Sequence, residues 1–248
     1  MNDDKHADHY SFLSDKHWIA DPVQAVFMSG PRKALFRAIM KQKPKKVLDV
    51  CCGTGVMANW FASRGIETIG IDSSQTMLGR AERKGWITRA KLMDAGQMEF
   101  DKEFYGAYIN LAIYEMAPEL REQVWQKMVQ AVRDGGIVTV MVLNAPQKDA
   151  RFSRFWRGFF ELDERNFLRT NPAHYSNYCE FIQNGGLESW MTQRVTKLDS
   201  EKYFFAGNIG VLSAVVGNKI HAVKRQCAGV GPAKQPESTW ECTDIAAK

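Results

Sequence analysis

The sequence lacks any apolar run long enough to cross a membrane. Gly, Asn or a charged residue interrupts each run well before about 18 residues. The first ten residues, MNDDKHADHY, also lack the basic start and the apolar core of a secretory signal peptide. We therefore expect a cytoplasmic protein, and we leave membrane association open.

Cysteine is scarce, and its spacing excludes the common metal sites. The chain has five cysteines, at Cys51, Cys52, Cys179, Cys227 and Cys242. No Cys-x-x-Cys pair or Cys/His cluster has zinc spacing, so no metal site is predicted. The count is odd and the only close pair is adjacent in sequence, so we expect reduced thiols.

The composition is that of an ordinary globular protein, with 248 residues, 45% of them hydrophobic and 25% charged. We expect a helical cap segment over residues 1–45 and one main domain over 46–224. Within that domain, residues 145–175 are expected to be an inserted lid. Residues 225–248 show little periodicity and are expected to be a flexible tail.

Positive charge is concentrated in residues 32–46, where seven basic side chains occur and no acidic one. A solvated helix face followed by a basic loop explains this segment. A patch that attracts phospholipid head groups or nucleic acid phosphates explains it equally. The charge pattern alone leaves both interpretations open.

Apolar strands alternate with amphipathic helices through the first two thirds of the chain. Strands are predicted at 46–52, 66–72, 87–95, 104–114 and 135–144, and two more at 187–198 and in a segment ending at 210–219. Alternation of this kind produces a parallel sheet with right-handed crossovers. The predicted fold is therefore an α/β, Rossmann-like, doubly wound sheet of seven strands, mostly parallel, with an antiparallel last strand.

A glycine-rich turn follows the first strand in VLDVCCGTG, residues 47–55. Gly53 and Gly55 allow positive φ and let a ligand approach the backbone, and the next helix offers unpaired N–H groups. Acidic residues Asp49, Asp72 and Asp94 stand at or near the ends of three strands, where ligands bind in open α/β sheets. Asp72 can accept from ribose hydroxyls, or it can cap the helix that begins at Ser73.

Five ordered segments resemble the motifs of class I S-adenosylmethionine (SAM) dependent methyltransferases. They are VLDVCCGTG, IGIDSSQTML, LMDAGQMEF, INLAIYEM and VRDGGIVTVMVLN. The resemblance implies SAM as cofactor, with the turn at the methionine part, Asp72 at the ribose and Asp94 at the adenine. Cys51 replaces the first glycine of the family's turn. The cofactor-binding residues that it implies are Asp49, Cys51, Gly53, Gly55, Asp72, Ser73, Met77, Asp94, Ala95 and Asn110.

Candidate residues for the acceptor side follow the fourth strand and the insertion. Tyr114 and Glu115 either face the acceptor or begin the next helix, and His174 is the nearby histidine whose side chain suits general base work. In residues 151–160, helical spacing separates five aromatic residues from three arginines. This pattern predicts a helix that packs on the sheet edge, covers an apolar acceptor, or contacts a membrane interface.

The resemblance is greatest to the branch that methylates quinones and related lipophilic small molecules. We therefore expect a small, lipophilic, quinone-like acceptor, with possible peripheral membrane contact and no nucleic acid partner. The alternatives are a phosphatidylethanolamine-type phospholipid N-methyltransferase and a non-catalytic SAM-binding partner protein. A dehydrogenase using NAD would instead carry GxGxxG in the turn, which this chain does not.

Overall fold

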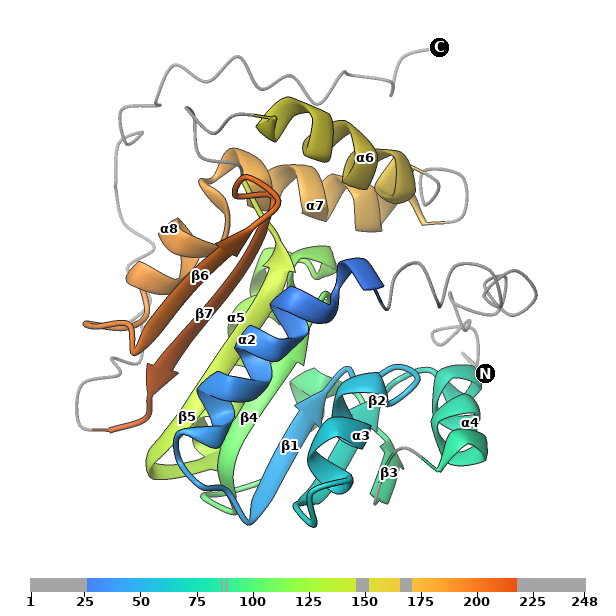
Figure 1. Ribbon diagram of the computed structural model, residues 1–248, viewed down its shortest axis with the longest axis vertical. Helices are drawn as coiled ribbons and strands as arrows, with labels where there is room; N and C mark the ends of the chain where they lie inside the picture. Colours follow the sequence, from blue (N-terminus) through green and yellow to red (C-terminus); the bar gives the residue numbers. More distant parts are fainter. Residues whose placement is uncertain (1–25, 86, 88, 146–151, 166–170, 218–248) are drawn as a thin grey trace.

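The computed structural model describes residues 26–85, 87, 89–145, 152–165 and 171–217 (Figure 1). Much of the expected cap segment, the tail at 225–248 and parts of the lid, with Arg151, therefore lie outside the described residues. The strands are β1 (Lys46–Val50), β2 (Glu67–Asp72), β3 (Arg89–Leu92), β4 (Phe104–Asn110), β5 (Val132–Leu143), β6 (Ser200–Phe204) and β7 (Ile209–Val215).

The seven strands form one sheet in the order β3-β2-β1-β4-β5-β7-β6. Strands β1 to β5 pair in parallel, whereas β7 is antiparallel to both of its neighbours, β5 and β6. The predicted Rossmann-like sheet with an antiparallel last strand is confirmed. The order reverses beside β1, which is the switch point where such sheets bind ligands.

Helices cover both faces of the sheet. They are α2 (Ser29–Met40), α3 (Val56–Ala62), α4 (Gln75–Lys84), α5 (Pro118–Ala131), α6 (Ser153–Arg165), α7 (Pro172–Gln183) and α8 (Gly186–Thr192), with short 3-10 turns η2 (Ala95–Gln97) and η3 (Ile113–Glu115). Helices α2 and α3 lie side by side on one face, where Phe36 packs on Phe61 with ring centroids 4.8 Å apart. Helices α5 and α8 meet through Trp125 and Trp190, 5.4 Å apart.

The core consists of the apolar strands and the helix faces that pack on them. Central β5 carries an unbroken run of buried side chains from Ile137 to Leu143, as expected for a strand covered by helices on both faces. Helix α5 buries Val124, Met128 and Ala131 at helical spacing. Burial of this kind provides most of the free energy of folding, at about 25 cal/mol per Å² of apolar surface.

The strand predicted at 187–198 is wrong, because the chain forms helix α8 there. Gly185 begins the helix in a left-handed conformation with φ of 91°. Leu187, Trp190 and Met191 are all buried, and their spacing of three and four residues suits a helix face rather than a strand face. Strand β6 begins only at Ser200.

Candidate functional site

The turn after β1 has the geometry of a ligand cradle. Cys51, Gly53 and Gly55 have positive φ angles of 56°, 53° and 76°, and Gly55 directly precedes α3. A methyl group added at Gly53 would meet no atom within 4 Å, so open space adjoins the backbone there. The residues present therefore fit a nucleotide-like group held against the turn and the start of α3.

Asp72 joins the end of β2 to this turn. Its carboxylate accepts hydrogen bonds from the backbone N–H of Gly53 at 2.8 Å and of Ser74 at 2.9 Å. Ser74, and not Ser73, is the residue that caps α4, since its hydroxyl accepts from the N–H of Met77 at 3.2 Å. Ser73 is exposed beside it. Asp72 therefore stabilises the turn whether or not it also holds a ribose.

Asp94 lies two residues beyond the end of β3 rather than at its last position. Its carboxylate accepts from the N–H of Gly96 at 2.8 Å and so caps the short turn η2, in which Ala95 is buried. The side-chain amide of Gln123 on α5 donates to the carbonyl of Gly96 at 2.8 Å. This second bond fixes the Asp94 loop to the helix layer.

The Cys51 thiol in the turn after β1 experiences the charge of several acidic residues. Burial raises the pKa of this thiol well above its usual value, and the charges of Asp72, Glu115, Asp49 and Asp94 raise it further. Four acidic residues from separate parts of the chain thus act electrostatically on one atom of the turn. An excess of negative charge at this point favours a cationic ligand, such as one that carries a sulfonium and an ammonium group.

Asp49 itself is almost fully buried in β1. Burial and the charge of Asp72 raise the pKa of its carboxyl, and the nearby Tyr108 hydroxyl and the Ala58 backbone oppose this rise. Burial also raises the pKa of Tyr108, and the charge of Asp49 adds to that effect. Asp49 and Tyr108 are thus a buried polar pair on neighbouring strands, since Asp49 of β1 pairs with Tyr108 of β4.

Asn110 ends β4 next to the same turn, because Val50 of β1 pairs with Ile109 of β4. Its buried side-chain oxygen has no hydrogen-bond partner among the described residues. The following residue, Leu111, has a positive φ of 56°, as Cys51 does. Strained backbone of this kind is typical of ligand sites. Asn110 therefore offers an unused acceptor at the switch point.

The three residues expected on the acceptor side come together in one buried network. His174 on α7 lies with Nδ1 3.4 Å from the Glu115 carboxylate of η3 and with Nε2 2.7 Å from the carboxylate of Glu164. The Tyr114 hydroxyl donates to Glu164 at 3.0 Å. Tyr114, Glu164 and His174 are all at most 4% exposed, so the network is shielded from water.

Glu164 is the member of this network that sequence reasoning missed. It lies near the end of α6, ten residues before His174 and 50 after Tyr114. Its neighbours in ELDER give no sign that it is buried, because charged residues in such a run are usually solvated. Only the packing of α6 on α7 brings its carboxylate to the histidine.

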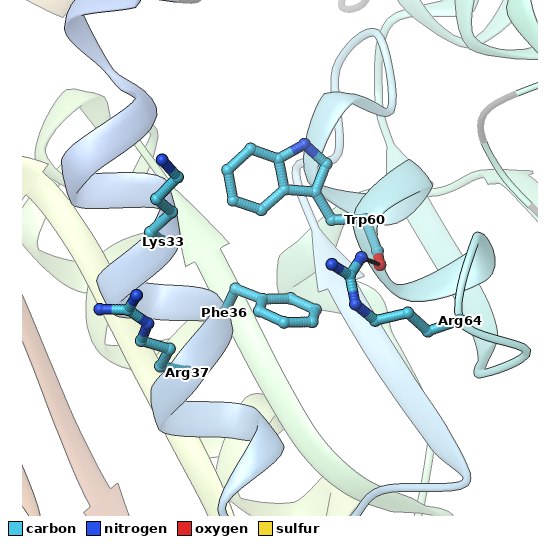
Figure 2. A pocket seen from close by; sticks show the side chains of 5 residues that line it. All are labelled: Lys33, Phe36, Arg37, Trp60 and Arg64. Carbon is cyan, nitrogen blue, oxygen red and sulfur yellow. Dashed lines mark hydrogen bonds between the residues drawn. The ribbon is translucent and has the colours of Figure 1, made fainter.

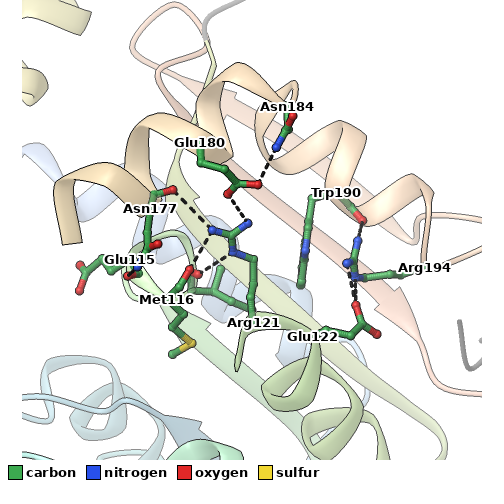
Figure 3. Close-up of polar contacts among 10 residues, drawn as sticks. Glu115, Met116, Arg121, Glu122, Asn177, Glu180, Asn184, Trp190 and Arg194 are labelled. Atoms are coloured by element: carbon green, nitrogen blue, oxygen red, sulfur yellow. Dashed lines mark hydrogen bonds and ion pairs between the residues drawn. The ribbon is translucent and has the colours of Figure 1, made fainter. Parts of the chain in front are cut away.

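A buried arginine holds the network in place (Figure 3). Arg121 on α5 donates to the carbonyls of Ile113 and Met116, at 3.2 and 2.9 Å, and pairs with Glu180 of α7 at 3.0 Å. Asn177 of α7 donates to the carbonyl of Glu115 at 2.8 Å. These contacts fix η3, and with it Tyr114 and Glu115, between α5 and α7.

Some of the aromatic side chains of α6 pack against the rest of the protein, and others are exposed to solvent. Trp156 and Phe160 pack on Phe205, with ring centroids 4.7 and 5.5 Å apart, whereas Phe155 and Phe159 are exposed. Arg157 pairs with Glu161, one turn later on the same helix, at 3.6 Å. Helices α6 and α7 lie over the carboxyl ends of β4 and β5 (Figure 1).

Among the described residues, no group of three or more His, Cys, Asp or Glu has the arrangement of a metal site. No described helix is long and apolar enough to span a membrane. Cys51 and Cys52 are free thiols, but Cys179 is disulfide-bonded, so the expectation of reduced thiols is wrong for Cys179.

An open α/β sheet with a glycine-rich turn and carboxylates at its switch point defines a Rossmann-like ligand-binding domain. Residues 47–136 match the family described as Methyltransferase domain. This part of the chain therefore has the sequence of a methyltransferase domain, and SAM is the cofactor that the family match indicates, as the motifs predicted.

Similar proteins include an uncharacterized methyltransferase from Synechocystis, 29% identical over 41% of this chain and 49% of its own length. The ubiquinone biosynthesis O-methyltransferase of Alkalilimnicola ehrlichii is 27% identical over 64% of this chain and 63% of its own. The chain thus spans about half to two thirds of the length of these relatives.

Among solved structures, the fold is shared with the 1,6-didemethyltoxoflavin-N1-methyltransferase of Burkholderia thailandensis. The TM-score is 0.55 and the sequence identity 16%, over 85% of this chain and 87% of that one. That structure contains S-adenosylhomocysteine and the acceptor. At this identity the likeness concerns the fold alone.

Proposed function

We propose that this chain transfers the methyl group of SAM to a small, lipophilic acceptor and that Glu115 takes the acceptor's proton. The proposal rests on one observation above all. Glu115 lies in η3, a few residues beyond the end of β4, which pairs with β1 beside the cofactor turn, and its carboxylate lies 3.4 Å from Nδ1 of the buried His174. It is thus the carboxylate that connects the His174 network to the strand end beside the cofactor turn.

For the cofactor, we propose the residues that the motifs imply. Asp72 and Ser73 hold the ribose, Asp94 and Ala95 frame the adenine, and Met77 packs beside it. Asn110 and the turn from Asp49 to Gly55 hold the methionine part. Bound SAM supplies a methyl group on a sulfonium, which is already activated for transfer. The protein then has to align the acceptor and exclude water.

Proton removal is needed when the acceptor is a hydroxyl. Its oxygen bonds to the methyl carbon, the carbon–sulfur bond breaks with its electron pair on sulfur, and the hydroxyl proton passes to Glu115. His174 lies between the two carboxylates, hydrogen-bonded through Nε2 to Glu164 at 2.7 Å and with Nδ1 3.4 Å from Glu115, and so positions the Glu115 carboxylate. Tyr114 fixes the position of the Glu164 carboxylate by donating a hydrogen bond to it.

The aromatic residues of α6 support a lipophilic acceptor. Phe155 and Phe159 are 66% and 47% exposed, and they lie beside the packed ring of Trp156. Apolar area of this kind favours an apolar ligand by about 25 cal/mol per Å² buried. The ubiquinone biosynthesis O-methyltransferase that the chain resembles is named for a lipophilic product.

The test is to incubate a cell extract with the protein and deuteromethyl-SAM and to analyse the lipid-soluble fraction by mass spectrometry. We expect one deuteromethylated product. The variant Glu115→Gln should then bind SAM normally but turn over about 100-fold more slowly, the range for loss of a general base. Glu119→Gln, on the exposed start of α5, is the matched control and should be unaffected.

Two results would contradict the proposal. If SAM binds but no fraction of the extract becomes labelled, the chain is a non-catalytic SAM-binding protein. If a labelled product forms at the normal rate with Glu115→Gln, then Glu115 is not the base. A labelled product confined to the water-soluble fraction would overturn the lipophilic acceptor while leaving methyl transfer intact.

A further inference from the structure

A pocket of about 400 Å³ lies between α2 and α3, on the helical layer rather than at the cofactor turn. It is lined by Lys33, Phe36 and Arg37 from α2, by Trp60 from α3, and by Arg64 just after α3 (Figure 2). Its volume is within the range of pockets that bind small molecules. The proposed methyl transfer gives this pocket no role.

Two aromatic rings form its walls. Phe36 and Trp60 meet edge to face, with ring centroids 6.1 Å apart and ring planes at 72°. Phe36 also packs on the fully buried Phe61 at 4.8 Å, so this wall is anchored in the core. The aromatic corner is therefore preformed, which lowers the entropy lost when a planar ligand binds.

Three cations surround the aromatic pair. Lys33 and Arg37 flank it on the α2 side and Arg64 on the α3 side (Figure 2). The Arg64 guanidinium lies 4.6 Å from the centroid of the Phe36 ring and donates to the carbonyl of Trp60 at 2.8 Å, which fixes its position. The remaining N–H groups of this guanidinium stay available as donors.

No acidic side chain lines the pocket, and none of these three cations forms an ion pair among the described residues. A concave site with three positive charges and no compensating carboxylate attracts an anion. The indole face of Trp60 adds an apolar surface on which a flat ring can stack. The positive charge and the aromatic surface of the pocket thus both favour an anion that carries a flat ring.

We propose that this pocket is a second binding site, for a small organic anion with a planar ring. The ring stacks on Trp60 against Phe36, and Lys33, Arg37 and Arg64 hold its carboxylate, phosphate or sulfonate. The site is separate from the cofactor turn, because none of its lining residues belongs to the segment from Asp49 to Gly55. The inference does not depend on the proposed methyl transfer.

The experiment is calorimetric titration with naphthalene-2-sulfonate, with the cofactor site saturated by S-adenosylhomocysteine. Naphthalene-2-methanol serves as the neutral ring and sulfate as the anion without a ring. We expect the full chain to bind the sulfonate at least about tenfold more tightly than either comparison compound. Lys33→Gln/Arg37→Gln should lose about tenfold in affinity, and Trp60→Leu should lose a similar factor.

The charge control is Arg83→Gln/Lys202→Gln, which removes two exposed cations elsewhere and should leave the affinity unchanged. Equal losses in both double variants would mean non-specific attraction and would overturn the proposal. Equal binding of the neutral ring or of sulfate would overturn it as well. Binding to phosphatidylglycerol vesicles that depends on Lys33 and Arg37, without binding of the free sulfonate, would make the occupant a membrane instead.

Discussion

The Glu164 carboxylate on α6 lies 2.7 Å from Nε2 of His174 on α7, and both side chains are almost fully buried. This contact joins α6, which follows β5 in the chain, to the network that contains Tyr114 and Glu115 of η3, which follows β4. Glu164 also accepts from Tyr114, so two separate segments depend on one carboxylate. Helix α6 is therefore connected through His174 to Glu115, the proposed base.

Replacing this carboxylate tests the coupling. Glu164→Gln keeps the size of the side chain but removes the charge that faces His174, so we expect a loss of about 1–3 kcal/mol in the free energy of unfolding. Turnover should fall and its pH profile should shift, while SAM affinity, measured by calorimetry, stays unchanged. Chemical denaturation gives the stability.

Glu161→Gln on the same helix is the matched control. Glu161 pairs with Arg157 and Arg165 at 3.6 and 2.9 Å but does not contact His174. This variant should leave the pH profile of turnover as it is. If both variants had the same pH profile of turnover, Glu164 would stabilise the fold without positioning His174 for the reaction.

The variant Asp72→Ala should weaken SAM binding by about 10- to 100-fold. The carboxylate orders the turn through Gly53 and, as proposed, accepts from the ribose, and each charge-assisted bond contributes about 1.5–3 kcal/mol. Ser74→Ala is the comparison, since it removes the cap of α4 but leaves the Asp72 carboxylate in place, and it should cost about 1 kcal/mol of stability. Unchanged SAM affinity in Asp72→Ala would reject the ribose assignment.

The left-handed conformation of Cys51 predicts a difference between two substitutions. Cys51→Gly suits a φ of 56° and should change the free energy of unfolding by less than about 1 kcal/mol. Cys51→Val places a β-branched residue in the same conformation and should cost about 2 kcal/mol. Thermal unfolding of the two variants measures this difference. Equal stabilities would show that the turn adopts another conformation in solution.

Arg121→Met should destabilise the fold by about 2–3 kcal/mol. The arginine is 3% exposed, and without it the carbonyls of Ile113 and Met116 lose buried donors. Because η3 carries Glu115, turnover should fall as well. The comparison is Lys102→Met, which breaks an exposed pair with Asp134 at 2.9 Å and should leave the free energy of unfolding almost unchanged. Similar losses in both variants would contradict the role of Arg121.

The sequence by itself determined the sheet and the cofactor turn, because both depend on local patterns. Alternating apolar strands and helices specify a parallel doubly wound sheet, and Gly53 and Gly55 specify the turn. The segment 187–198 was misassigned as a strand, since a short apolar run suits either element. The segment forms helix α8 instead, and Trp190 of that helix packs on Trp125 of α5. This contact is between distant parts of the chain, so the local pattern did not reveal it.

Only the tertiary structure decided how the acceptor side is assembled. Tyr114, Glu115 and His174 were separate candidates in the sequence, and Glu164 looked like a solvated residue. Burial reverses that expectation, because a carboxylate removed from water needs a partner, and His174 and Tyr114 provide one. The pocket at Trp60 likewise exists only because α2 and α3 pack side by side and bring Arg64 to Lys33 and Arg37, which lie 31 and 27 residues earlier in the chain.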